Sequence, residues 1–461
     1  MSSNRGLASI GSRLPAPAGP ANRQVAMGPL RWMIVAAFVA FLCSIPFEAA
    51  LLFGDTGFFS ISRLVGYGFF GLALLQPGKC FKKPPRALWW FVLYLGIYVL
   101  TGLYQPSAYW PEIAATAFRL FQFLLLLWVG YNLLQDGRVA RWAFWGFGLA
   151  CVAVAGLLAV GVGVSAFRGI ASRQVVFGQG PNTLGAVIGL GAVALIGMVY
   201  GRVSARPMAK AAAWAGFLVV AVAIARTGSR GALVGVATGV MTLLASQGSA
   251  RTRMRNAMII VVALGASAWI AVSSATMASR WQRTVDEGSL SGRQRIWIAA
   301  FGMFEEKPLM GWGPATNYYE LGRRLALPRR DTHNVFLWLL TEQGFVGSIP
   351  FWIGLWLCAR AAWRGRKGAQ GLLPLALLVA VLTVNQSGTY YVTKWFWLSM
   401  AYALASETYL RQRKPRSAVP LTGRPRLDVI ARAGAAPGSR AKPAWHPVKN
   451  GYAEIGREPL T

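Results

Sequence analysis

Five side chains at the ends of apolar segments are candidates for chemistry on an anion. Arg226 and Arg230 lie in ARTGSRGALVGV, Arg293 and Arg295 begin the run RQRIWIAAF, and His333 precedes another apolar run. Guanidinium groups bind phosphate oxygens in bidentate forks, and they can stabilise a departing diphosphate without a metal ion. A neutral imidazole, whose ordinary pKa is about 6.5, is suited to act as a general base at neutral pH. These residue types indicate group transfer from a phosphate-linked substrate.

The same side chains also have ordinary structural interpretations. An arginine near a bilayer costs about 2.5–3.5 kcal/mol unless it finds an anion or water. No acidic residue lies between Asp136 and Asp286, so Arg230 could pair with Asp286 or Glu287 in the fold, or reach lipid head groups. The arginines of RQR could belong to a solvated helix start. His333 could be a helix cap or an interface residue, and His446, the other histidine, lies in a basic tail where solvent is expected.

The acidic residues and cysteines do not form a metal-site pattern. The five aspartates include no DxD pair, and no His, Asp or Glu cluster has ligand spacing. The cysteines, Cys43, Cys80, Cys151 and Cys358, include no CxxC pair, so neither a zinc site nor a disulfide framework is predicted. We therefore expect metal-independent chemistry with no cofactor.

The elements that must position these residues are membrane helices. The chain is 55% apolar and only 13% charged, and apolar blocks long enough to cross about 30 Å of hydrocarbon recur along it. We predict an all-α polytopic membrane protein with about 12 transmembrane helices. The predicted spans are residues 32–53, 58–76, 87–104, 113–134, 142–165, 183–200, 211–226, 231–246, 257–275, 334–358, 371–388 and 395–410.

The net charge of +32 follows membrane topology. Basic clusters recur on one side of the predicted spans, around residues 79–86, 138–141, 202–210, 251–255, 360–367 and from 411 onward. This distribution obeys the positive-inside rule and places both termini in the cytoplasm. We therefore interpret the charge as a topology signal, with membrane lipids and not nucleic acid as the partner.

This topology divides the chain into five segments. Residues 1–31 are a basic cytoplasmic tail, 32–275 hold spans 1–9, 276–333 form one large external loop subdomain, 334–410 hold spans 10–12, and 411–461 are a disordered basic cytoplasmic tail. Within the external loop, the spacing of Ile296, Ala300 and Phe304 predicts an amphipathic helix that ends before Pro308. Residues two apart on a helix point to different faces, so at most one of its two N-terminal arginines should face a site.

Three sequence blocks resemble the signature blocks of the O-antigen ligase family. They are TGSRGALVGV at 227–236, SGRQRIWIAAFGMFEEKPLMGWGP at 291–314, and THNVFLWLLTEQGFVG at 332–347. Their order and the long external loop also agree, so the resemblance covers roughly residues 220–350. It implies a multi-pass protein of the bacterial inner membrane. It also implies transfer of a saccharide from undecaprenyl diphosphate to an acceptor hydroxyl at the periplasmic face, by an O-antigen or exopolysaccharide polymerase or by an O-antigen ligase of lipopolysaccharide.

Carried onto this chain, the resemblance assigns the lipid-linked diphosphate to Arg230 and Arg293 and the activation of the acceptor to His333. Further substrate-binding candidates are Arg226, Ser229, Arg295 and Asn334. The implied partners are the undecaprenyl diphosphate-linked glycan and other polysaccharide assembly proteins. The alternative is a multi-span transporter or a flippase for lipid-linked saccharides, since Glu48 and Glu407 lie near or within spans.

Overall fold

The computed structural model describes residues 28–49, 60–167, 170–200, 207–245, 249–273, 278, 279, 282, 286 and 292–413. The first half holds α1 (Pro29–Ser44), η1 (Ile45–Phe47), α2 (Ile61–Leu74), α3 (Pro77–Cys80), α4 (Arg86–Leu103), η2 (Ser107–Tyr109), α5 (Trp110–Leu134), α6 (Gly137–Val160), β1 (Val164–Phe167), β2 (Ile170–Val176) and α7 (Pro181–Tyr200). The second half holds α8 (Pro207–Thr227), α9 (Arg230–Leu244), α10 (Ala250–Ser273), α12 (Arg293–Glu306), α13 (Thr316–Arg324), α14 (Val335–Gly365), α15 (Leu373–Val384), α16 (Lys394–Ala405) and α17 (Thr408–Arg413).

Every predicted span overlaps at least one helix, so the mostly helical prediction is confirmed for the described residues. Seven of these helices are long and apolar enough to cross a membrane: α1 with η1, α4, η2 with α5, α6, α7, α8 and α14. Helices α2, α9 and α15 are apolar but shorter. The number of about 12 crossings therefore stays a prediction.

One segment departs from the all-α prediction. The predicted span 142–165 ends early, because α6 stops at Val160 and Gly161 follows in the left-handed conformation with φ 83°. Such a C-terminal glycine is a common helix stop. The chain then forms a two-stranded antiparallel hairpin of β1 and β2. This hairpin positions Arg173, which was not among the predicted site residues.

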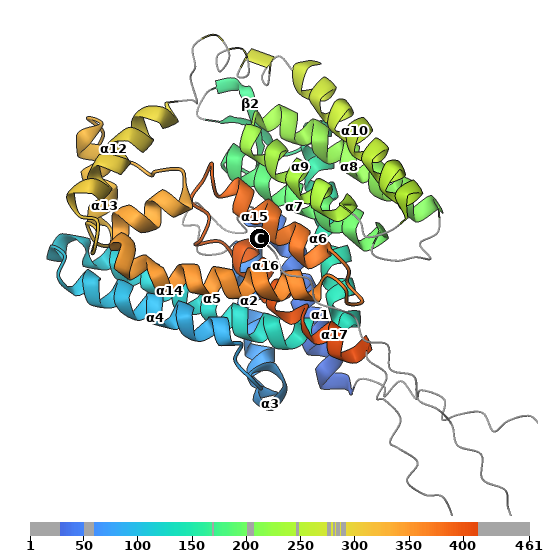
Figure 1. Ribbon diagram of the computed structural model, residues 1–461, viewed down its shortest axis with the longest axis horizontal. Coiled ribbons are helices and arrows are strands. Elements are labelled where there is room, and N and C mark those ends of the chain that lie inside the picture. The colour runs from blue at the N-terminus through green and yellow to red at the C-terminus, as the bar shows by residue number, and fades with distance from the viewer. Residues whose placement is uncertain are drawn as a thin grey trace, which may run out of the picture. The chain divides into compact units, whose positions relative to one another are not determined.

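Helix α7 is the centre of one group of helices. It packs against α6, α8, α9 and α15, and nearly all of its residues are buried. Its glycines permit this close packing: a Cβ on Gly185 would lie 2.9 Å from the Cβ of Ser229 on the α9 side. A second group consists of α4, α5, α14 and α16, and α15 and α16 pack against each other to join the two groups (Figure 1).

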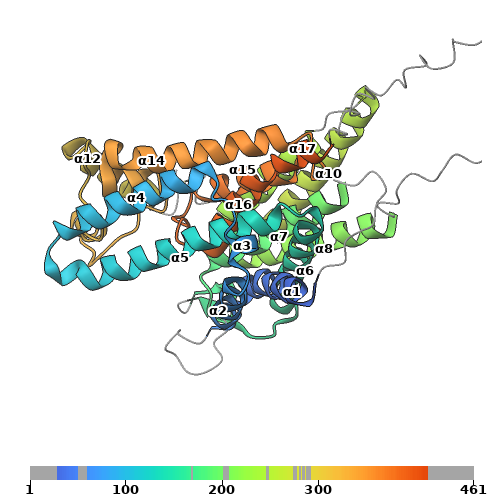
Figure 2. The same cartoon turned by 90° about the horizontal axis from the view of Figure 1, so that it is seen from below.

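The segment between α10 and α14 has a small core of its own. Ile296, Ala300 and Met303 of α12 are buried against Leu321 of α13, and Trp312 packs beside them. The amphipathic helix predicted before Pro308 is α12, and α13 was not predicted. Figure 2 shows α12 beside the ends of α4, α5 and α14. Tyr319 of α13 stacks on Tyr109 at the start of α5 with ring centroids 4.6 Å apart, which fixes this subdomain on the α4–α5 turn.

Candidate functional site

The linker Asn385–Thr393, between α15 and α16, brings the predicted site segments together. Val335, the first residue of α14, donates its backbone N–H to the carbonyl of Asn385 at 3.0 Å. Thr389 donates its hydroxyl to Asp331 Oδ1 at 2.6 Å. Arg293 of α12 donates from Nη2 to the carbonyl of Ser387 at 2.8 Å. The segment before α14 and the start of α12 therefore meet at one linker, and we call this end of the helices the site end.

The start of α9 reaches the same linker. Gly231 follows Arg230 and packs so closely against Ser387 that a Cβ there would collide with the serine hydroxyl. Arg230 and Arg293 are therefore both tied to Ser387, one through its neighbour and one through a hydrogen bond. Burial lowers the pKa of Arg293. Tyr390 raises this pKa in part, and the charge of Arg230 lowers it further. An arginine remains protonated despite such shifts, so the site concentrates positive charge.

His333 is held in an unusual backbone conformation by the residue two before it. Its φ of 51° lies in the left-handed region, which non-glycine residues rarely occupy outside functional or tightly constrained positions. The backbone N–H of His333 donates to Asp331 Oδ1 at 2.5 Å, and the imidazole Nδ1 lies 3.9 Å from the same oxygen. Asp331 therefore constrains the backbone of His333 and lies near its ring.

The electrostatic surroundings favour a neutral imidazole. Burial lowers the pKa of His333, Asp331 raises it, and the charges of Arg293 and Arg330 lower it. The net direction is downward from about 6.5, so the ring is uncharged at neutral pH and can accept a proton. The His333 side chain is 35% exposed, so the ring is not sealed inside the protein.

Sequence reasoning missed Arg173 and Tyr390. Arg173 extends from β2, donating from Nη2 to Asn182 Oδ1 at 3.1 Å and from Nε to the carbonyl of Thr227 at 3.2 Å. Burial lowers its pKa, and Arg293 lowers it further, so the two guanidinium groups share one environment. Burial raises the pKa of Tyr390 to about 12, against the charges of Arg293 and Arg173. Arg173 could have been identified by the argument applied to Arg226, that an arginine beside a predicted span needs an anion or water. No feature of the sequence indicated Tyr390.

The other predicted binding residues have structural contacts of their own. Arg226 donates from Nη1 to the carbonyls of Leu158 and Ala159 at 2.9 Å each, which caps the end of α6. Ser229 is buried at the start of α9, against α7. Asn334 accepts from the N–H groups of the first turn of α14 as its N-cap. Arg295 is exposed while Arg293 is half-buried, and that at most one of them faces a site stays a prediction.

The carboxylates that favoured a transporter lie in ion pairs at helix ends. Glu48 Oε1 is 2.7 Å from Lys394 Nζ, and Glu407 Oε1 is 3.5 Å from Arg364 Nη1. Glu287, an alternative partner for Arg230, lies outside the described residues. Within the described part of the chain, no three His, Cys, Asp or Glu side chains gather to form a metal site.

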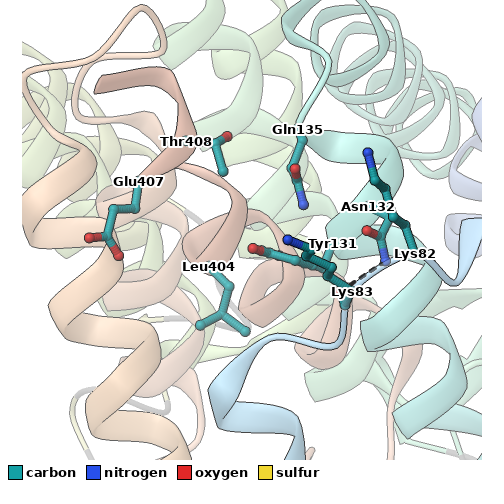
Figure 3. Close-up of a pocket in the computed structure, with 8 residues that line it drawn as sticks. All are labelled: Lys82, Lys83, Tyr131, Asn132, Gln135, Leu404, Glu407 and Thr408. Carbon is teal, nitrogen blue, oxygen red and sulfur yellow. Dashed lines mark hydrogen bonds between the residues drawn. The ribbon is translucent and has the colours of Figure 1, made fainter. Parts of the chain in front are cut away.

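A polar pocket of about 290 Å³ lies where α4 begins and α5 and α16 end, away from the site end. Figure 3 shows the residues that line it. Its walls are Lys82, Lys83, Tyr131, Asn132, Gln135, Leu404, Glu407 and Thr408. Asn132 donates from Nδ2 to the carbonyl of Lys83 at 3.4 Å. This pocket contains none of the predicted site residues, so it is separate from the arginine and histidine cluster.

Comparison with known proteins matches one segment of the chain. Residues 215–352 match a family model described as O-antigen ligase. The matched segment includes Arg230, Arg293 and His333 and ends within α14, whereas Arg173 and the linker Asn385–Thr393 lie outside it. No curated protein matches the chain.

Proposed function

We propose that this chain, of which residues 215–352 match the O-antigen ligase family model, transfers a saccharide from a polyprenyl diphosphate carrier to an acceptor hydroxyl. Convergence at Ser387 carries this proposal. Arg293 from the loop subdomain and the start of α9 with Arg230 meet at that residue, although they are far apart in sequence. A site where several guanidinium groups gather is suited to an anionic ligand, and a diphosphate has matching charge and oxygen geometry.

In the proposed mechanism, Arg230 and Arg293 bind the diphosphate and His333 removes the proton from the incoming hydroxyl. The hydroxyl oxygen attacks the anomeric carbon as the bond to the diphosphate oxygen breaks, so the anomeric configuration inverts. The proton goes to the imidazole, and the negative charge of the leaving group goes to the arginines. Stabilising a developing charge is worth about 10² to 10³ in rate per donor, and general base assistance is worth about 10² to 10⁴.

We place the site end at the periplasmic face of the inner membrane. Lys82 and Lys83 lie at the opposite end of α4, beside the end of α5 and the start of α17. Arg364 lies near the end of α14, whereas His333 precedes its beginning. Basic residues favour the cytoplasmic side, so their location supports a periplasmic site and cytoplasmic termini.

The proposal is tested with purified protein in nanodiscs and an undecaprenyl diphosphate-linked oligosaccharide. Transfer should continue with EDTA present, and His333→Ala should abolish most of it. Arg295→Ala is the control, because Arg295 lies two residues from Arg293 and its side chain is exposed. Unimpaired transfer by His333→Ala would remove the base assignment. Transport of intact lipid-linked saccharide across the bilayer without cleavage of the diphosphate bond would instead favour the flippase alternative.

The acceptor distinguishes polymerase from ligase within this proposal. A strain lacking a polymerase would accumulate single repeat units, whereas a strain lacking a ligase would retain long chains on the carrier lipid. The same purified enzyme can be offered a second lipid-linked repeat or a lipid A core as acceptor. Gel electrophoresis then shows chain growth for a polymerase or a modified core for a ligase.

A further inference from the structure

Helix α14 is interrupted near its first third. Gly344 has φ 64° and ψ −171°, a conformation that is essentially restricted to glycine. A side chain there would collide with the backbone of Leu309 and Met310. The interruption divides α14 into a first part that follows His333 and a longer part that continues through Gly365.

The loop after α12 fills this interruption with backbone hydrogen bonds. Phe345 donates its N–H to the carbonyl of Pro308 at 2.7 Å, and Val346 donates to the carbonyl of Leu309 at 3.1 Å. In the other direction, Trp312 donates to the carbonyl of Thr341 at 2.8 Å. Residues 308–310 and 345–346 therefore form one unit, which we call the elbow. The bonds satisfy backbone groups that a broken helix would otherwise leave unpaired.

The position of the elbow can be measured along α4, which packs beside α14. Thr101 donates its hydroxyl to Gln343 Oε1 at 3.0 Å, and a Cβ on Gly347 would lie 3.4 Å from the Ile97 side chain. Residues 344–346 thus lie level with residues 97–101, about 3–9 Å below the end of α4 at a rise of 1.5 Å per residue.

Helix α4 has no length to spare. Its 18 residues extend about 27 Å, slightly less than the hydrocarbon core that it must cross. Positions level with residues 97–101 therefore lie inside the apolar layer when α4 spans it. Tyr104, almost fully exposed just beyond the helix, occupies the interfacial level that aromatic residues favour.

The exposed side chains of the elbow are all apolar. Leu309 is 63% exposed, Met310 56%, and Phe345 and Val346 48% each. Phe345 continues onto Trp352, at 5.9 Å between ring centroids, and Trp352 lines an apolar groove with Ile349, Ile353 and Trp356 along the spanning part of α14. The elbow is thus continuous with a helix face that membrane lipid must cover.

We propose that the elbow is a re-entrant contact of the loop subdomain with the bilayer, its side chains covered by lipid hydrocarbon. The contact anchors the loop that follows α12 in the outer edge of the apolar layer, while the charged end of α12 at Glu306 stays outside it. If the proposed function holds, this anchor keeps Arg293 at the depth where the diphosphate of a membrane-bound donor lies. The lipid contact itself requires no assumption about the reaction.

The test places an environment-sensitive NBD fluorophore at residue 309. Leu309→Cys is made in a Cys43→Ser background, because Cys43 is partly exposed and the other cysteines are buried. Arg323→Cys is the control, since the Arg323 side chain is 75% exposed in the polar α13. Both labelled proteins are placed in nanodiscs and quenched with aqueous iodide or with phospholipids that carry a doxyl group near the head group.

We expect the iodide quenching constant at residue 309 to be roughly tenfold below that at residue 323, because an ion is excluded from hydrocarbon. Doxyl lipid should quench residue 309 and spare residue 323. Equal iodide quenching at both positions would overturn the proposal, and so would protection from both quenchers, which would mean that protein covers the elbow. Neither readout depends on catalysis, so the lipid contact can fail while the proposed transfer stands, or the reverse.

Discussion

Replacement of Arg293 is the sharpest test of the proposed diphosphate site. One N–H of its guanidinium is used by the carbonyl of Ser387 at 2.8 Å, which leaves the rest of the five-donor fork for phosphate oxygens. Lysine keeps the charge but carries its three donors on one nitrogen and loses the planar fork that binds two phosphate oxygens. A charge-assisted hydrogen bond contributes about 1.5–3 kcal/mol, so Arg293→Lys should slow transfer by about 10- to 150-fold.

Removing the charge should cost more. Arg293→Ala is expected to lower the rate by about 10² to 10³, the loss typical of one donor to a developing negative charge. The assay is single-turnover transfer from a polyprenyl diphosphate-linked oligosaccharide in nanodiscs, with excess enzyme so that chemistry is isolated from product release. Arg295→Ala, two residues away and exposed, should transfer at the unmodified rate. Full activity in Arg293→Lys would refute the fork, and equal rates for both alanine variants would remove Arg293 from the site.

Three further predictions concern the base, the missed arginine and the broken helix. Because the pKa of His333 is lowered, the transfer rate should stay constant through neutral pH and fall only below about 6.5. Asp331→Asn removes a carboxylate that raises this pKa, so the acid limb of the pH–rate profile should move to lower pH. A move to higher pH would contradict the assignment of His333 as the base. Arg173→Ala should raise KM for the lipid-linked donor by about 10-fold or more, measured by titrating donor, and an unchanged KM would exclude Arg173 from donor binding. Gly344→Ala should destabilise the fold by more than about 3 kcal/mol in thermal unfolding, because it combines backbone strain with a collision against residues 309 and 310. The control Gly96→Ala has open space around the new Cβ and should be neutral or stabilising. Equal Tm values for the two variants would refute the elbow geometry.

The helices were largely predictable, because continuous apolar runs have few alternatives once the bilayer removes water from the backbone. Their interruptions were not. The predicted span 334–358 passes through Gly344, where only the polar pair Glu342 and Gln343 hinted at a break. The compensating hydrogen bonds come from Pro308 and Leu309, more than thirty residues earlier. A break that is repaired by backbone atoms from elsewhere leaves almost no signal in its own residue types.

The candidate site shows the same limit. Arg230, Arg293 and His333 were chosen as candidates because charged or titratable residues are unusual at the ends of apolar segments. Arg293 is bound to Ser387 through the serine carbonyl, a backbone atom that any residue could supply, and Arg230 is linked to it only through the packing of Gly231 on the serine side chain. Arg173 was missed because α6 was expected to extend through residue 165, which left no structure assigned to the hairpin. Sequence therefore identified chemical groups, and the fold was needed to identify their neighbours.

The depth of the site follows from helix lengths. Helix α15 has 12 residues and extends about 18 Å, and α9 has 15 residues and extends about 22 Å, both short of a hydrocarbon core of about 30 Å. If both begin or end near the basic surface, the linker Asn385–Thr393 and the start of α9 lie below the opposite surface. Polar backbone is tolerated there only where protein or water satisfies it, and Arg293 and Val335 do so from the loop side. The short helices and the proposed re-entrant elbow therefore both require part of the loop subdomain to lie below the membrane surface. The loop subdomain must reach down into the bilayer edge to meet the helices, and a diphosphate that is anchored by its lipid would enter the site sideways from the membrane.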